Sequence, residues 1–223
     1  MRIAIPESHD SGRHFTVCRD KVGVGLTVLS SGTLRRVKAL CILFLAGVVS
    51  IPTLSAAPRR PGQPDIRIPS LEHRVHDLIN KTRVEHMLGP LVFDERLSAI
   101  ARGHSRDMAS RDFFGHTNPD GLDATARGKR AGFTCRKQVS ARSFREGLGE
   151  NLYQDNLYAR IRTIGTTRSY DWNTSDNIAA NSVRAWMNSQ GHRHNILESV
   201  YTQTGIGIAI GDDDKVYVTQ VFC

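Results

Sequence analysis

Residues 186–197 read WMNSQGHRHNIL and join a helical pattern to a histidine-containing segment. Trp186 belongs to an amphipathic helical pattern that stops near Ser189, and His192 follows directly after a glycine. Neutral imidazole can ligate a metal, transfer a proton or cap a helix. The stretch therefore predicts a packed helix that ends at a polar site.

Two earlier segments carry the other residues expected at this site. Residues 113–121 read FFGHTNPDG and place His116 in a loop before a Pro-Asp-Gly turn. Residues 149–152 read GENL and place Glu150 between residues that tolerate unusual backbone angles. The alternative roles are a surface-loop histidine and a carboxylate that fixes a turn. Taken together, the segments predict one polar site built from distant parts of the chain.

Three other polar groups fit structural roles better. His194 diverges from His192 on a helix, so we expect His194 to face solvent or to cap the helix. His104 falls on the apolar face of a helix, where a lone histidine is usually a hydrogen-bonded core residue. Residues 212–214 are three aspartates, which lack the ligand spacing and closing glutamate of a calcium loop. We expect a solvated hairpin tip there.

The hydrophobic pattern predicts helices first and strands last, with no regular βαβ alternation, which favours the α+β class. Residues 134–145 and 154–175 are polar without a clear period, and we expect long surface loops there. The expected helices are 71–88, 97–108 after a cap at Asp94, 122–131, and one that starts near Thr174 or Ser175 and includes Trp186; the expected strands are 205–210 and 216–222.

The N-terminal part predicts an exported protein. The chain has 223 residues, of which 39% are hydrophobic and 23% charged, a globular composition. Residues 39–51 form an uncharged apolar run that is short for a membrane-spanning helix, with basic residues before it and small residues after it, as in a secretory signal. A buried helix or an uncleaved anchor are the alternatives. We expect a leader (1–57), a linker (58–69) and a folded domain (70–223) that is secreted, periplasmic or extracellular.

Charge argues against one class of partner, and the cysteine content predicts a disulfide. Residues 1–57 hold seven of the 30 basic and three of the 22 acidic residues, so the remainder carries a net charge of +4. No basic stripe interleaved with aromatic residues accompanies this charge, so we expect no nucleic-acid partner. Cys135 and Cys223 remain after the leader, in an oxidising compartment. We expect them to pair and hold down the final strand, with two unrelated thiols as the alternative.

The motifs, taken as an ordered set, resemble the CAP superfamily of cysteine-rich secretory proteins, antigen 5 and plant pathogenesis-related protein 1. FFGHTNPDG, GENL, WMNSQGHRHNIL, GIGIAI and VYVTQVF occur in that order over residues 71–222, and the bacterial SCP-domain branch is the most similar. The resemblance implies a three-layer α-β-α sandwich around an antiparallel sheet. It also implies an open cavity, lined by two histidines and acidic residues, that holds a divalent cation in some relatives.

Carried over to this sequence, the cavity histidines are His116 and His192, and the GENL glutamate is Glu150. Animal and plant members usually have a second glutamate three residues after the helix tryptophan, where this chain has Ser189. The resemblance therefore implies weak binding of Zn²⁺ or Mg²⁺ and no organic cofactor. Supporting motif positions are Trp186, Ser189 and Asn195.

Three functions are compatible with these residues. A monomeric binding module for a lipid, sterol, peptide or cell-envelope ligand is favoured, because most members of the family are not established enzymes. A metal-assisted, peptidase-like hydrolase would use His116, His192 and Glu150, but two nitrogen ligands make a poor catalytic zinc site. A serine hydrolase built on Ser189, His192 and Glu150 lacks a recognisable nucleophile elbow. No catalytic residue is therefore assigned.

The leader generates the first prediction. N-terminal sequencing of the exported protein should find a first residue between about Ala56 and Gln63, because small residues follow the apolar run there. A cytoplasmic protein that still begins at Met1 would contradict export.

Overall fold

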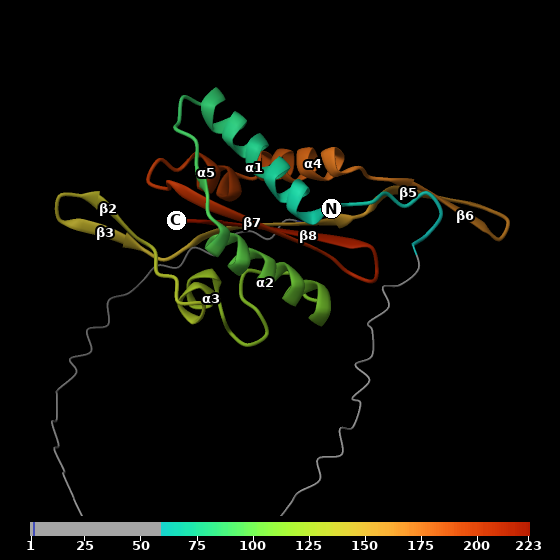
Figure 1. The fold of residues 1–223 in the computed structure, drawn as a ribbon, viewed down its shortest axis with the longest axis horizontal. Coiled ribbons are helices and arrows are strands. Elements are labelled where there is room, and N and C mark those ends of the chain that lie inside the picture. Colours follow the sequence, from blue (N-terminus) through green and yellow to red (C-terminus); the bar gives the residue numbers. More distant parts are fainter. Residues whose placement is uncertain (1, 3–58) are drawn as a thin grey trace, which may run out of the picture. The chain divides into compact units, whose positions relative to one another are not determined.

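The computed structural model describes Arg2 and residues 59–223, so the leader and its apolar run lie outside the described residues. A four-stranded sheet with the order β1-β7-β8-β4 forms the centre of the described domain (Figure 1). β7 pairs antiparallel with β8 and β8 antiparallel with β4, whereas the short β1 runs parallel to β7. The strands are β1 (Val92–Phe93), β4 (Gly149–Asn156), β7 (Gln203–Ile210) and β8 (Lys215–Phe222).

Helices cover both faces of this sheet, which makes the expected three-layer α-β-α sandwich (Figure 1). One layer contains α1 (Ile68–Glu85), α4 (Ser175–Asn188) and α5 (Gln190–Leu197), and the other contains α2 (Glu95–Arg111) and α3 (Ala124–Arg130). Among the described residues, no helix combines the length and apolar content needed to cross a bilayer.

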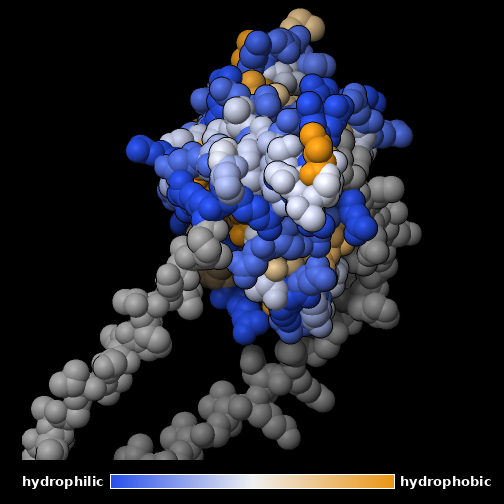
Figure 2. Space-filling model, turned by 90° about the vertical axis from the view of Figure 1, so that its right-hand side faces the viewer, coloured by the Kyte–Doolittle hydropathy of each residue, from blue (hydrophilic) through white to orange (hydrophobic). Residues whose placement is uncertain are grey.

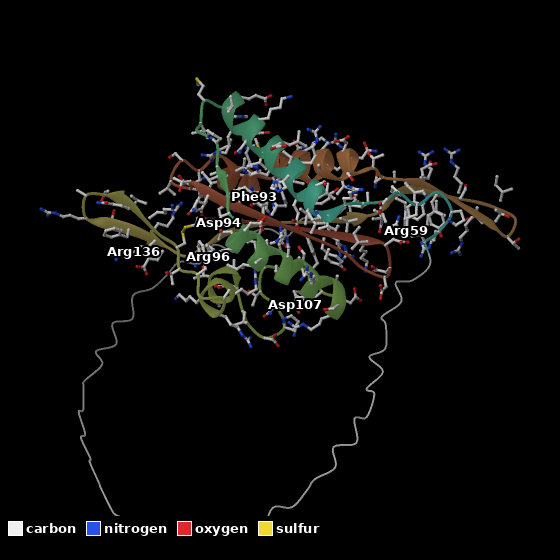
Figure 3. The ribbon with its side chains drawn as sticks, viewed as in Figure 1. Arg59, Phe93, Asp94, Arg96, Asp107 and Arg136 are labelled. Carbon is white, nitrogen blue, oxygen red and sulfur yellow. A yellow bond between two sulfur atoms is a disulfide. The ribbon has the colours of Figure 1, made fainter. Side chains whose placement is uncertain are left out.

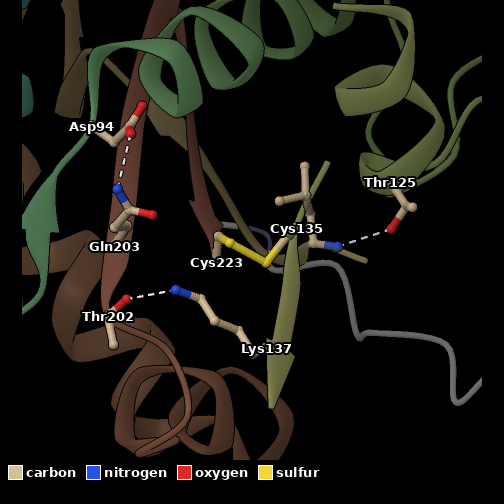
Figure 4. Close-up of a disulfide and its surroundings, with 8 residues drawn as sticks. Asp94, Thr125, Cys135, Lys137, Thr202, Gln203 and Cys223 are labelled. Carbon is tan, nitrogen blue, oxygen red and sulfur yellow. Dashed lines mark hydrogen bonds between the residues drawn. A yellow bond between two sulfur atoms is a disulfide. The ribbon is translucent and has the colours of Figure 1, made fainter. Parts of the chain in front are cut away.

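The caps that start two helices are those expected from the sequence. Asp94 accepts hydrogen bonds from the backbone N–H groups of Arg96 and Leu97 at 2.8 and 3.0 Å, so it satisfies two otherwise unpaired donors of α2. Asp94 lies at the start of α2 (Figure 3), and its other oxygen accepts from Gln203 Nε2 at 3.2 Å, which ties the start of α2 to β7 (Figure 4). Thr174 caps α4 in the same way.

The alternation of glycine and isoleucine in β7 sets the distance between the sheet and α2. Gly205 and Gly207 face α2, where an added Cβ would lie 2.1 Å from Ser98 N and 2.0 Å from Arg102 N. Ile206 and Ile208 point to the other face and pack in the main core with residues of α1 and α4. Helix α2 therefore lies directly on the backbone of β7.

The prediction of long surface loops at residues 134–145 and 154–175 is wrong. Each segment contributes to a two-stranded hairpin outside the four-stranded sheet. The β2–β3 hairpin consists of β2 (Arg136–Ser140) and β3 (Ser143–Glu146), and the β5–β6 hairpin consists of β5 (Tyr158–Ile164) and β6 (Thr167–Trp172). Their side chains are mostly exposed on both faces, so no apolar alternation marks them in the sequence. Residues 154–156 instead extend β4.

The tip between β7 and β8 is less solvated than expected. Asp214 is only 7% exposed and forms an ion pair with Arg60, while Asp213 forms an ion pair with Lys215 at 2.6 Å. The Arg60–Asp214 pair holds the tip against the segment that precedes α1.

Cys135 and Cys223 form a disulfide across 88 residues (Figure 4). The bond joins the chain just before β2 to the residue after β8. Nearby, Lys137 Nζ donates to Thr202 Oγ1 at 2.7 Å. The cross-link therefore holds both the final strand and the base of the β2–β3 hairpin.

The glycine contacts generate a prediction about stability. Replacing Gly207 with alanine forces a methyl group into the backbone of α2, so we expect the free energy of unfolding to fall by at least about 2 kcal/mol in urea titration. Gly103→Ala is the matched control within α2, since nothing lies within 4 Å of its added Cβ. That variant should be as stable as the parent or up to about 1 kcal/mol more stable. Equal stability of both variants would contradict the close packing.

Candidate functional site

Glu150 lies at the centre of a buried polar cluster. It comes from β4, where it pairs with Val221 of β8, and the residue is only 6% exposed. His116 donates a hydrogen bond through Nδ1 to Glu150 Oε1 at 2.9 Å, and the Arg127 guanidinium pairs with Oε2. Both carboxylate oxygens are therefore engaged by protein side chains. The structure brings His116 and Glu150 together as the sequence predicts.

Arg127 is the site residue that the sequence analysis missed. Helix α3 is capped by Asp123 and carries Arg127 to the carboxylate of Glu150. The guanidinium also donates to the backbone oxygens of His116 and Leu122 at 2.8 and 2.7 Å, so it holds the His116 loop as well. Arg127 is one of three basic residues in a short polar helix, and nothing in their spacing separates it from Lys129 and Arg130.

His104 is buried and hydrogen bonded, as the sequence predicts, but it also borders the site. The residue is 1% exposed, and its Nε2 donates to the backbone oxygen of Gly115 at 3.0 Å. The same Nε2 lies 3.9 Å from Glu150 Oε1. His104 is therefore both a buried core residue and a neighbour of the Glu150 carboxylate.

His192 reaches the site from the junction of α4 and α5. It is fully buried, and its Nδ1 shares a 2.8 Å hydrogen bond with Ser189 Oγ. Its ring is roughly parallel to that of His116, with 6.3 Å between centroids and 28° between planes. The two predicted cavity histidines are thus neighbours. His194 has a 68% exposed side chain and lies 3.6 Å from Glu198, which agrees with its expected solvent-facing role.

Amide side chains fasten α5 to β4 beneath this site. Asn195 Nδ2 donates to the backbone oxygen of Glu150 at 3.1 Å and to Asn151 Oδ1 at 2.9 Å. Asn151 Nδ2 donates to the backbone oxygen of His192 at 3.2 Å. Trp186 is fully buried, and its indole N–H donates to the backbone oxygen of Leu152 at 3.0 Å. Asn195 and Trp186 therefore position the site without entering it.

The charges of the cluster fix two protonation states. Burial acts to raise the pKa of Glu150, but the hydrogen bond from His116 and the positive charge of Arg127 outweigh it and hold the pKa below its usual value. Burial lowers the pKa of His104, and the attraction of Glu150 offsets this only in part. Near neutral pH, Glu150 is therefore a carboxylate and His104 is a neutral imidazole.

The arrangement limits the chemistry open to this site. Its hydrogen bonds pair Glu150 with His116 and Ser189 with His192, so they do not form one serine–histidine–glutamate relay. Among the described residues, no three or more histidine, cysteine or acidic side chains are grouped as metal ligands. The Nδ1 atom of His116 contacts Glu150 and that of His192 contacts Ser189, so both rings are oriented by polar side chains, as is usual for histidine ligands.

Comparisons with known proteins agree with this architecture. The profile of the CAP family, described as the cysteine-rich secretory protein family, matches residues 76–222. Two proteins of Bacillus subtilis (strain 168) are similar in sequence, and both are described as uncharacterized. The membrane protein YlbC is 30% identical over 151 residues, which make up 68% of this chain and 34% of YlbC. YkwD is 29% identical over 140 residues, which make up 63% of this chain and 43% of YkwD. The chain thus spans less than half of either relative.

Solved structures show the same fold. An extracellular protein containing an SCP domain from Bacillus anthracis (strain Ames) has a TM-score of 0.50 and 26% identity, with 75% of this chain and 44% of that chain covered. An outer surface protein of Borrelia burgdorferi has a TM-score of 0.50 at 16% identity, with 72% and 96% covered, and supports the fold alone. The profile match, the sandwich and the ordered motifs agree: this chain belongs to the cysteine-rich secretory protein (CAP) family, in its bacterial SCP-domain branch.

Proposed function

We propose that this chain is an exported binding module, and that Glu150 serves as the buried anchor of its site. The supporting observation is that Arg127 and His116 engage both oxygens of a carboxylate that is almost fully buried. A general base must reach the proton that it removes, directly or through one water. Both Glu150 oxygens are already engaged and its side chain is only 4% exposed, which favours an anchoring role over that of a base in a metal-assisted hydrolase.

The proposed site holds a divalent cation weakly between the imidazole rings of His116 and His192, whose centroids lie 6.3 Å apart. Histidine ligands whose Nδ1 is fixed by a carboxylate or another polar group are typical of zinc sites, and imidazole suits Zn²⁺ better than Mg²⁺. The two Nδ1 contacts, to Glu150 and Ser189, fit this pattern. Two nitrogen ligands beside the positive Arg127 favour low affinity. The bound ion would supply a positively charged contact for a ligand.

A groove between α2 and α3 supports a lipid-like ligand over a peptide. Its volume is about 330 Å³ and its walls are largely apolar, with Arg127 and His104 among the residues that line it. An apolar groove beside a guanidinium fits a molecule with an apolar part and an anionic group. The remaining lining residues are Ala99, Ile100, Gly103, Arg130 and Ala131.

The proposed location is secreted, periplasmic or extracellular. The disulfide between Cys135 and Cys223 fits an oxidising compartment, and the similar Bacillus anthracis protein is extracellular. The signal-like residues 39–51 provide the route. We propose a monomer that meets envelope or extracellular lipids, and metal analysis with lipid extraction of the protein from its own compartment tests this directly.

The cation site gives a prediction about Zn²⁺ affinity. His116→Ala and His192→Ala should each weaken Zn²⁺ binding at least tenfold in calorimetry, because each removes one of two ligands. The affinity of the parent should fall as the solution is made acidic, since only the neutral imidazole binds metal. His194→Ala is the control, as its side chain is exposed. Unchanged binding in both cavity variants would refute the site.

The anchor role of Glu150 gives a prediction about stability. Glu150→Gln leaves the Arg127 charge buried and unpaired, so we expect a loss of about 3 kcal/mol at pH 7 in urea titration. Because folding lowers the pKa of Glu150, its stabilisation is full above the unfolded-state pKa and is lost as pH falls through the folded-state pKa. The difference between parent and variant should therefore shrink in acid.

Glu85→Gln serves as the control for this experiment, because Glu85 is exposed. The parent should show no turnover on peptide, ester or glycan libraries. A parent activity that collapses in a fully folded Glu150→Gln protein would favour the hydrolase instead.

A further inference from the structure

The β5–β6 hairpin carries an exposed apolar tip. The hairpin projects beyond the central sheet and is not hydrogen bonded to it (Figure 1). Residues 163–167 read TIGTT and carry no charge, and Gly165 makes the turn with a φ of 61°. Ile164 is 81% exposed. A single exposed isoleucine is common on protein surfaces, so its meaning here depends on the residues around it.

Basic residues bracket this tip on both strands. The hairpin contains Arg160, Arg162 and Arg168 and one acidic residue, Asp171, so its 15 residues carry half of the +4 net charge of residues 58–223. Arg162 and Arg168 directly flank the uncharged tip, and both are exposed. Figure 2 looks onto the end of the domain from which the hairpin projects and shows isolated hydrophobic residues among mostly hydrophilic ones.

The base of the hairpin is fixed to the domain. Tyr170 and Trp172 stack with 4.8 Å between ring centroids, and Tyr158 packs edge-on against both. Trp172 Nε1 donates to the backbone oxygen of Pro61 at 3.2 Å, and Arg60 lies 5.3 Å from the centroid of the Tyr170 ring. The rings are therefore occupied at the base, and Ile164 at the tip is the more exposed of the two isoleucines of the hairpin, at 81% against 41% for Ile161.

From these observations we propose that the tip of the β5–β6 hairpin inserts into the surface of an anionic lipid bilayer. A strand rises about 3.3 Å per residue, so Ile164 extends roughly 7 Å beyond Arg162. Apolar side chains of interfacial segments reach about 5–10 Å into the boundary between headgroups and acyl chains. Ile164 then enters the acyl boundary while Arg162 and Arg168 meet the lipid phosphates.

Two comparisons favour a bilayer over other partners for this tip. A nucleic acid is bound through exposed aromatic faces that stack on bases, whereas the rings here pack against one another and against the linker. The β2–β3 hairpin also exposes Val139 and Phe144, but Arg136 stacks on the Phe144 ring, and these side chains are 50% and 47% exposed against 81% for Ile164. The contact goes beyond the proposed cavity function, because it uses none of its residues.

Sedimentation with lipid vesicles tests the tip. The protein recovered from its secretory compartment is mixed with phosphatidylcholine vesicles, with and without about one third phosphatidylglycerol. The parent should bind the anionic vesicles only, and more weakly at high salt. The double variant Arg162→Gln, Arg168→Gln should partition into the anionic vesicles at least tenfold less than the parent. The reason is that each arginine near an anionic surface contributes about fivefold to binding. Ile164→Ser should lower it severalfold at constant net charge.

Matched controls separate the tip from bulk charge and hydrophobicity. Arg74→Gln with Arg106→Gln removes the same charge from exposed helix positions, and Arg74, like Arg162, has one surface ion pair. Val84→Ser removes another exposed aliphatic side chain. All variants keep the same N-terminus, so only the substituted side chains differ. Both controls should bind as the parent does.

The proposal would be overturned if the control variants lost as much vesicle binding as the hairpin variants, or if the hairpin variants lost none. It would also be overturned if the parent bound single-stranded oligonucleotides but not vesicles. His116→Ala tests the two proposals independently of each other, because it should weaken Zn²⁺ binding and leave vesicle binding unchanged. Failure of either proposal is thus distinguishable from failure of the other.

Discussion

The buried charge of Glu150 is the constraint on which the site depends. A carboxylate inside a protein is strongly destabilising unless it is paired and hydrogen bonded. Its position on β4, beside the last strand of the sheet, requires partners from other elements to reach it. Helix α3 supplies Arg127, the loop after α2 supplies His116, and α2 places His104 nearby. The neutralisation of one side chain thus ties three consecutive segments, α2, the loop after it and α3, to β4.

The sheet makes this convergence possible. Gly205 and Gly207 let the backbone of α2 lie against β7, and this close approach carries His104 down to the level of the carboxylate on β4. On the other face, Asn195 and Asn151 tie α5 to β4 and bring His192 beside His116. The same strand therefore receives helices from both layers, and the site forms where the two sets of contacts meet.

Sequence reasoning succeeded where an element has one buried face or a recognisable cap. The helix that starts at Asp94, the helix that ends in the WMNS motif and the two final strands all have such signals, and the motif order identified the fold. It failed for both two-stranded hairpins, because side chains exposed on both faces leave no period-2 pattern. It also failed for Arg127, since its role arises from the tertiary path of α3. A buried glutamate implies a cationic partner, but the sequence alone offers many arginines.

Ser189 orients a site histidine without changing the charge of the site. Its hydroxyl shares a hydrogen bond with His192 Nδ1 and adds no negative charge. Arg127 balances the charge of Glu150, and burial favours the neutral form of His104. These three groups together carry no net charge, so a cation would meet imidazole nitrogens but little electrostatic attraction. Such a site can keep both histidines in place for a ligand whether or not a metal ion is bound.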